Sequence, residues 1–193
     1  VVNGAERVVV SQLHRSPGIS YERSTSSSGA NLFSFRLIPD HGSWVEVQQD
    51  ANSIIHIYLD RQHRRRKFLA STFLRALGHS TDEELLRIFY SVEELQLDQL
   101  KGLDDKALEK YALKEDVIDS DSKTLLAKQF ERMTSKLVKQ LRAINVEKIS
   151  LVNISWDDGI FLDNVRKDKT RSTDDALKEL FKILRPGNPP TPA

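Results

Sequence analysis

The chain has no cysteine and a single methionine, Met133. Without a thiolate it cannot form a cysteine-ligated zinc site or use a cysteine nucleophile. The lack of cysteine also fits a reducing compartment, and we expect the protein in the cytoplasm. No stretch approaches the roughly 18 consecutive apolar residues that a membrane span needs, and the longest apolar runs, such as Val8-Val9-Val10, are the size of a strand. A membrane protein is therefore not expected.

The common motifs of enzymes are also missing. The eight glycines are scattered singly, so no glycine-rich loop is available to hold a phosphate. The five histidines include no pair at zinc-motif spacing, and His14 follows Ser11 without a hydrolase motif around it. Asp157-Asp158-Gly159 lacks the spaced ligands of a calcium loop and is more typical of an acidic turn. We therefore expect no catalytic residue, no metal site and no cofactor in this chain.

The ends suggest part of a longer protein. The chain begins with Val1 rather than methionine, and residues 189–193 form a proline-rich tail that no regular element can accommodate. We expect a piece taken from a larger polypeptide.

The net charge of +1 conceals an uneven distribution. Residues 1–80 carry ten Lys and Arg against six Asp and Glu, whereas residues 81–130 carry seven against thirteen. Residues 131–193 are again basic, with twelve against nine. This pattern suggests that only one face of the protein would meet a polyanion, although such swings are also common in solvated helices.

The first part of the sequence is rich in strand patterns. Residues 6–10, 32–38, 44–47 and 53–59 have the apolar content or alternation of strands. Ser16-Pro17-Gly18 predicts a turn, and residues 24–29 predict a polar loop.

Helices follow. Apolar spacing over residues 68–77 predicts a helix that Gly78 ends, and Thr81 with Glu84 forms a capping box for the next one. Further helices are expected over residues 131–143 and after Ser172, with a strand over 146–154. The fold class is therefore α+β, with mixed β-structure in the first third and helices packed on it.

Residues 61–67 hold five full positive charges, from Arg61, Arg64, Arg65, Arg66 and Lys67. Guanidinium groups in such a run can bind phosphate oxygens because they are weakly hydrated and fork-shaped. The alternative is a solvated basic turn. Crowded like charges favour a bound counter-charge, so we favour binding.

Trp44 and Arg15 are each open to two interpretations. Trp44 can be a core residue at a strand start, or an aromatic surface on which an unpaired base stacks. Arg15, beside a Pro-Gly turn, can contact a phosphate or form a surface ion pair. Local sequence does not decide between them.

Residues Asn3–Gly18 resemble the NGTERVVVSQLHRSPG signature of bacterial RNA polymerase β subunits. Further landmarks follow in the family's order. They are Ser27-Ser28-Gly29, Ile38-Pro39, Gly42-Ser43-Trp44, Asp60, the 64–67 run, Leu74–Gly78, Leu184–Gly187 and Pro189-Pro190-Thr191. The resemblance is strong over residues 1–95 and 174–191. Gln62-His63 departs from it, as do residues 96–173.

The resemblance implies the lobe of that subunit, one jaw of the cleft around downstream DNA, in a DNA-directed RNA polymerase (a nucleotidyltransferase). Arg15 and Trp44 match positions that touch the non-template strand, and Arg64, Arg65, Arg66 and Lys67 match a basic segment facing the DNA. A further set matches the edge of the rifamycin pocket: Arg7, Val10 and Gln12.

The resemblance also implies partners and a division of the chain. The partners are DNA and the β′, α, ω and sigma subunits, with the catalytic magnesium held by β′, so the fragment alone should be inactive. We expect a lobe core of residues 1–95 and 156–193, with 96–155 a lineage-variable insertion. The alternative function is a docking module for a transcription factor or phage inhibitor through residues 96–170.

Overall fold

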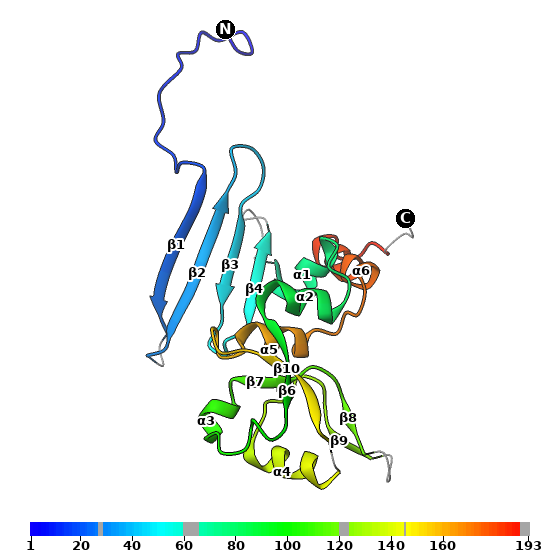
Figure 1. Cartoon of the computed structure of the whole chain (residues 1–193). Helices are drawn as coiled ribbons and strands as arrows, with labels where there is room; N and C mark the ends of the chain where they lie inside the picture. Colours follow the sequence, from blue (N-terminus) through cyan, green and yellow to red (C-terminus); the bar gives the residue numbers. More distant parts are fainter. Residues whose placement is uncertain (27–28, 60–65, 120–123, 145, 190–193) are drawn as a thin grey trace.

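The computed structural model describes residues 1–193 except 27–28, 60–65, 120–123, 145 and 190–193. Residues 18–69 contain a five-stranded antiparallel sheet whose strands follow one another in chain order (Figure 1). The strands are β1 (Gly18–Thr25), β2 (Asn31–Ile38), β3 (Val45–Gln49), β4 (Ile55–Leu59) and β5 (Arg66–Leu69). Consecutive pairing of this kind needs only short turns between neighbouring strands.

The β3–β4 turn shows how local chemistry sets the pairing. The Asp50 carboxylate accepts hydrogen bonds from the backbone amides of Asn52 and Ile54, both at 2.9 Å. Ser53 takes the left-handed conformation, with φ of 61°. An aspartate that binds the backbone ahead of it stabilises a tight turn, and here it fixes the register Gln49↔Ile55.

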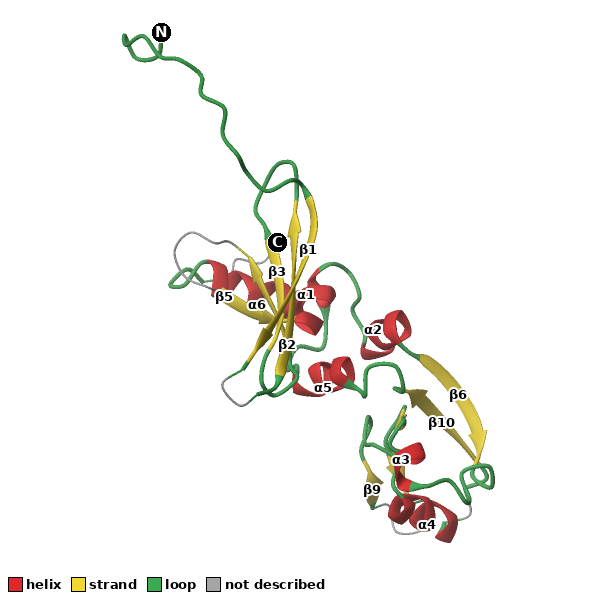
Figure 2. Ribbon diagram, turned by 90° about the vertical axis from the view of Figure 1, so that its left-hand side faces the viewer, coloured by secondary structure: helices red, strands yellow, loops and turns green. Residues whose placement is uncertain are grey.

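Helices pack beside the β4–β5 side of this sheet and leave β1 and β2 projecting beyond them (Figures 1 and 2). They are α1 (Ala70–Ala76), α2 (Asp82–Phe89), α5 (Ile160–Lys167) and α6 (Thr173–Leu184). The predicted capping box is confirmed, because Thr81 Oγ1 accepts from the Glu84 amide and the Glu84 carboxylate accepts from the Thr81 amide, each at 3.2 Å. Gly78 follows α1 with φ of 119°, as expected of a helix-ending glycine.

A second unit follows α2. Its sheet has the order β6 (Ser91–Gln96), β10 (Lys148–Asn153) and β7 (Tyr111–Leu113). It also contains α3 (Asp105–Leu108), α4 (Ser135–Ala143) and a hairpin of β8 (Val117–Ile118) with β9 (Leu125–Ala127).

Strand β10 is shared by two hydrophobic cores. Ile149 and Leu151 belong to the core of the second unit, together with Met133 and Leu141. Val152 belongs to the core beneath the helices of the first unit. Neighbouring residues of a strand point to opposite faces, so one strand can contribute side chains to both cores. The proposed boundaries of lobe core and insertion remain a prediction.

The α+β class is confirmed, but two local predictions are wrong. Residues 6–10 form no strand, and Val8 and Val9 are 88% and 98% exposed. Valines favour a strand only where a partner strand satisfies the backbone, and within the described residues this segment has none. Phe68 and Leu69 belong to β5 rather than to the following helix, because pairing with β4 overrides their helical spacing.

Arg75 of α1 is completely buried and joins three segments. Its Nη1 donates to the Ser80 carbonyl at 2.7 Å, its Nη2 donates to the Asp82 carboxylate, and its Nε lies 3.6 Å from Asp168 Oδ2. Two of these partners come from the start of α2, and Asp168 ends α5. A buried cation is tolerated only when it is paired in this way.

Asp168 is itself held by hydroxyl and amide donors. Thr72 Oγ1 donates to it at 3.1 Å, and the Thr170 amide and hydroxyl donate at 2.8 and 2.7 Å. Burial raises the pKa of this carboxyl, but the hydrogen bonds from Thr170, Ser71 and Thr72 outweigh it, so the pKa lies below its ordinary value. Asp168 is therefore ionised and serves Arg75 as a counter-charge.

Replacing Arg75 should destabilise the fold strongly. Arg75→Met keeps much of the side chain's length but leaves the buried Asp168 without its cation, so we expect a loss of about 3–5 kcal/mol in the free energy of unfolding. Urea unfolding followed by circular dichroism measures it. The control is Arg87→Met, which removes an exposed Arg–Glu83 pair at 2.9 Å on the neighbouring helix and should cost much less. Equal losses in both variants would contradict the role given to Arg75.

Candidate nucleic-acid interface

The strand register brings the predicted nucleic-acid residues to one end of the large sheet. Gly18 pairs with Ile38, and Leu37 pairs with Val45. Val45 pairs with Leu59, which in turn pairs with Arg66. The start of β1, the end of β2, the start of β3, the end of β4 and the start of β5 therefore share one sheet end (Figure 1).

Arg15, Trp44 and Arg66 lie at or beside these strand ends. Arg15 precedes β1 by three residues, Trp44 directly precedes β3, and Arg66 opens β5. Strands are spaced about 4.8 Å apart, so the sheet end is about 19 Å wide from β1 to β5. Residues 15, 44 and 66 are far apart in sequence and lie along the same end of the sheet, at its first, third and fifth strands.

The environments of these residues differ. Arg15 is exposed and lines a shallow hollow with Pro17, Ile19 and Ile38. Trp44 is half-buried, which leaves part of its surface open. A partly open aromatic ring can stack a base, and an exposed arginine can hold a phosphate.

The arginine run is only partly described. Arg64 and Arg65 lie outside the described residues. Arg66 is half-buried, and its Nη1 donates to the backbone carbonyl of Leu184 at the end of α6. A cation at a helix C-terminus is favoured by the unsatisfied carbonyls and the helix dipole, so Arg66 anchors β5 to α6. Lys67 is exposed and forms no such contact within the described chain.

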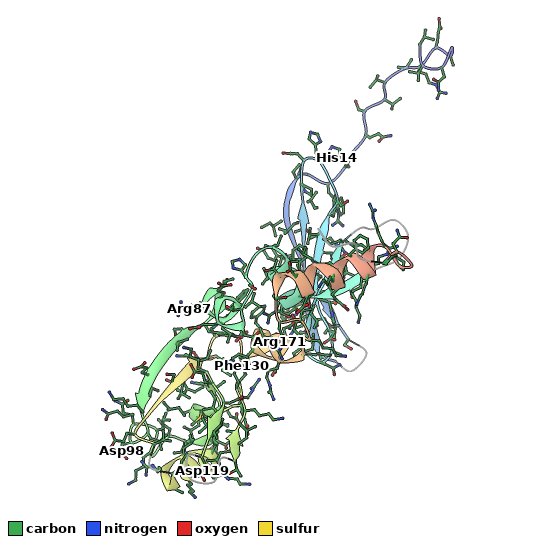
Figure 3. All side chains as sticks on the ribbon, turned by 90° about the vertical axis from the view of Figure 1, so that its right-hand side faces the viewer. His14, Arg87, Asp98, Asp119, Phe130 and Arg171 are labelled. Carbon is green, nitrogen blue, oxygen red and sulfur yellow. The ribbon has the colours of Figure 1, made fainter. Side chains whose placement is uncertain are left out.

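Arg7, Val10 and Gln12 lie apart from this edge. They belong to an exposed N-terminal extension that leaves the sheet and projects away from it (Figure 1). Figure 3 labels His14 at the base of this extension, next to the sheet end. The structure therefore groups Arg15 with Trp44 and Arg66, and separates the three residues of the expected rifamycin-pocket edge from them.

A second basic surface lies between β5 and α6, and no local motif in the sequence pointed to it. It is a cleft of about 560 Å³. Five exposed lysines line it: Lys67, Lys167, Lys169, Lys178 and Lys182. The only sequence signal was the four-residue spacing of Lys178 and Lys182, which places them on one face of a helix.

A separate apolar cleft of about 640 Å³ lies where the large sheet meets α1 and α5. It is lined mainly by aromatic and aliphatic side chains from β2, β3, β4, α1 and α5, including Phe33, Phe35 and Phe161. Trp156 stands at it, 63% exposed, with its indole Nε1 donating to the Phe89 carbonyl at 2.8 Å. Exposed apolar surface of this kind marks sites where other molecules bind.

The acidic turn at residues 157–159 has a structural task. Asp157 accepts from the amides of Gly159 and Phe161 at 2.9 and 3.0 Å and from the Tyr90 hydroxyl at 2.7 Å. Burial and the Asp157 carboxylate together raise the pKa of Tyr90, which stays protonated as a donor. Asp157 thus starts α5 and ties it to the end of α2.

No group of three or more histidine or acidic side chains converges as a metal site within the described part of the chain. The described helices also include none with the length and apolar character needed to cross a bilayer.

Comparison with known families identifies the class of this chain. Residues 15–152 match the family model of RNA polymerase Rpb2, domain 2. The chain belongs to this family, and the expected resemblance to the lobe of the β subunit is confirmed.

Similar proteins from several bacteria carry the name DNA-directed RNA polymerase subunit beta. The protein from Methylacidiphilum infernorum is 45% identical over 203 residues, an alignment that covers 99% of this chain and 16% of the relative. Those from Chlamydia trachomatis serovar L2 and Protochlamydia amoebophila are 44% and 40% identical, covering 99% of this chain and 15% of each relative. The chain thus spans about one sixth of the length of these relatives.

Proposed function

We propose that this chain acts in DNA-templated RNA synthesis as the lobe of a polymerase β subunit, with the shared end of strands β1–β5 contacting nucleic acid. The observation that carries the proposal is the register, which gathers Arg15, Trp44 and the start of the basic β5 segment on one edge. These three features are distant in the sequence and lie at the same end of the five-stranded sheet. The proposed ligands are the non-template strand and the downstream duplex.

Each residue has a distinct part in this proposal. Trp44 stacks an unpaired base, a contact worth about 1–3 kcal/mol. Arg15, Arg64, Arg65 and Lys67 neutralise phosphates. Arg66 reaches the same backbone through the guanidinium N–H groups that Leu184 does not occupy, since arginine carries five donors.

The remaining functions belong to the complete enzyme. We expect the β′ subunit to hold the catalytic magnesium, and β′, α, ω and sigma to be the chain's assembly partners. The chain by itself then has no nucleotidyltransferase activity. The compartment that fits this role is the cytoplasm.

A second candidate function is docking of a transcription factor or inhibitor through residues 96–170. It is favoured by Trp156, whose large exposed ring stands at the apolar cleft beside α5. This surface and the sheet end are separate, so the two functions can be tested independently.

The first test is a salt titration of DNA binding by the 193-residue chain. We expect weak, sequence-independent binding, near the roughly 10⁻⁴ M edge of non-specific affinities at physiological salt. The logarithm of the binding constant should fall against the logarithm of salt with a slope of about −2 to −4 if two to four basic residues engage, since each neutralised phosphate adds about −0.9. Replacing Arg15, Arg64 and Arg65 with Gln should flatten that slope, while Arg66 is kept because it anchors α6.

The matched control removes the same charge elsewhere. Lys106, Lys136 and Lys139 lie on α3 and α4 at the far end of the molecule (Figure 1), and their replacement by Gln should leave the slope unchanged. If the sheet-end variant and the wild type give the same slope on duplex and bubble DNA, the basic residues at this end face something other than DNA.

The rifamycin assignment gives a separate prediction. Gln12 is exposed on the extension and can offer hydrogen bonds without supporting a core. Substitutions of Gln12 in the whole polymerase should raise the rifamycin concentration needed for inhibition and leave polymerisation nearly unchanged. Sensitivity that stays constant across several Gln12 variants would remove this residue from the drug pocket.

A further inference from the structure

The cleft between β5 and α6 carries more positive charge than its own acids balance. Three acidic side chains line it with the five lysines: Asp168, Asp175 and Glu179. Asp168 is buried and already paired with Arg75, Thr72 and Thr170. Two exposed carboxylates therefore face five exposed ammonium groups.

None of the five lysines forms an ion pair or hydrogen bond within the described chain. Other lysines of the protein behave differently; Lys114, for example, lies 3.2 Å from Glu83 and 3.5 Å from Glu115. Crowded ammonium groups repel one another, and a concave surface with an excess of one sign of charge concentrates its field. A bound polyanion would relieve that repulsion.

The lysines come from three elements that face a common opening. Lys178 and Lys182 lie one turn apart on α6, about 6 Å along the helix axis. Lys67 stands on β5, and Lys167 and Lys169 flank the end of α5. Charges spread over three elements suit a chain of phosphates, whereas a single phosphate ion is bound by donors that converge on one point.

The cleft is continuous with the proposed interface at the sheet end. Lys67 directly follows Arg66, whose bond to the Leu184 carbonyl holds the start of β5 against the end of α6. A nucleic-acid backbone leaving the sheet end at β5 therefore meets the cleft next.

We propose that this lysine cleft is a second phosphodiester-binding site, which takes the backbone of a nucleic acid that has passed the end of the β1–β5 sheet. The proposal rests on the proposed function and adds α5 and α6 to its binding surface. Lys178 and Lys182 are its central residues, and they contact phosphates without reading base sequence.

The test replaces the two central lysines in the full 193-residue chain. Lys178→Gln with Lys182→Gln should flatten the salt dependence of DNA binding by about 1.8 in slope, because each lost phosphate contact contributes about 0.9 on duplex DNA. The same titration on a single strand of equal length should show a loss of about 1.4. In the wild-type chain, bound DNA should also slow acetylation of Lys178 and Lys182, a readout that needs no variant.

The control is Lys136→Gln with Lys139→Gln on α4, which removes the same charge at similar helical spacing and should leave the slope as in the wild type. If both double variants flatten the salt dependence equally, net charge alone explains the effect and the proposal of a binding site in the cleft is wrong. An unchanged slope in the cleft variant, with flattening in the sheet-end variant, would overturn the cleft and leave the proposed function standing. If neither variant changes the slope and the lysines are not protected, both proposals fail.

Discussion

The buried guanidinium of Arg75 is the interaction on which the arrangement of the helices depends. It must be paired because it is completely removed from water, and its partners come from the start of α2 and the end of α5. Arg171, which is labelled in Figure 3, extends the network outward and lies 3.2 Å from Asp82. The helices can therefore occupy only positions in which these charges meet. Helix α6 packs on α1, and Arg66 joins α6 to β5. The same network therefore helps to position α6, which lines the lysine cleft.

The second constraint is β10, the strand that serves two cores. Its neighbouring residues face opposite ways, so β10 contributes side chains to both cores, as β7 does through Ala112 and Leu113. In Figure 1, α3, α4 and the β8–β9 hairpin lie at the opposite end of the molecule from the sheet end. The excess of acids over residues 81–130 is largely on that side. The uneven charge seen along the sequence thus becomes a separation in space, which keeps most carboxylates of residues 81–130 away from the proposed DNA surface.

The sequence predicted features that depend on short-range signals. The Thr81–Glu84 capping box, Gly78 at the end of α1, Ser172 at the start of α6 and the alternation in β2 were all readable, because the cause and its effect lie within a few residues. Phe68 was assigned to the wrong element because a pairing partner in β4 decided its conformation. The valines of residues 8–10 look like a strand, yet strand formation requires a partner that the described chain does not supply.

The candidate site was predictable only in part. The assignment of Arg15 and Trp44 to nucleic acid was implied by resemblance to a family. Nothing in their local sequence placed them together, and only the register of four strand pairs does that. Arg66 looked like one more cation in a run, and its bond to Leu184 depends on α6, more than a hundred residues away. The lysine cleft had almost no sequence signal because its residues come from β5, α5 and α6.

The most direct test of the sheet-end interface uses the chain's two tryptophans. In the Trp156→Phe variant, Trp44 is the only tryptophan that contributes fluorescence. In the Trp44→Phe variant, the fluorescence comes only from Trp156, which lies beside the apolar cleft. Titrating a single-stranded oligonucleotide at low salt should quench the fluorescence of Trp44, because a base stacks on it, and should leave Trp156 unchanged. Quenching of Trp156 alone, or binding that leaves the emission of Trp44 unaltered, would contradict the assignment of this sheet end to nucleic acid.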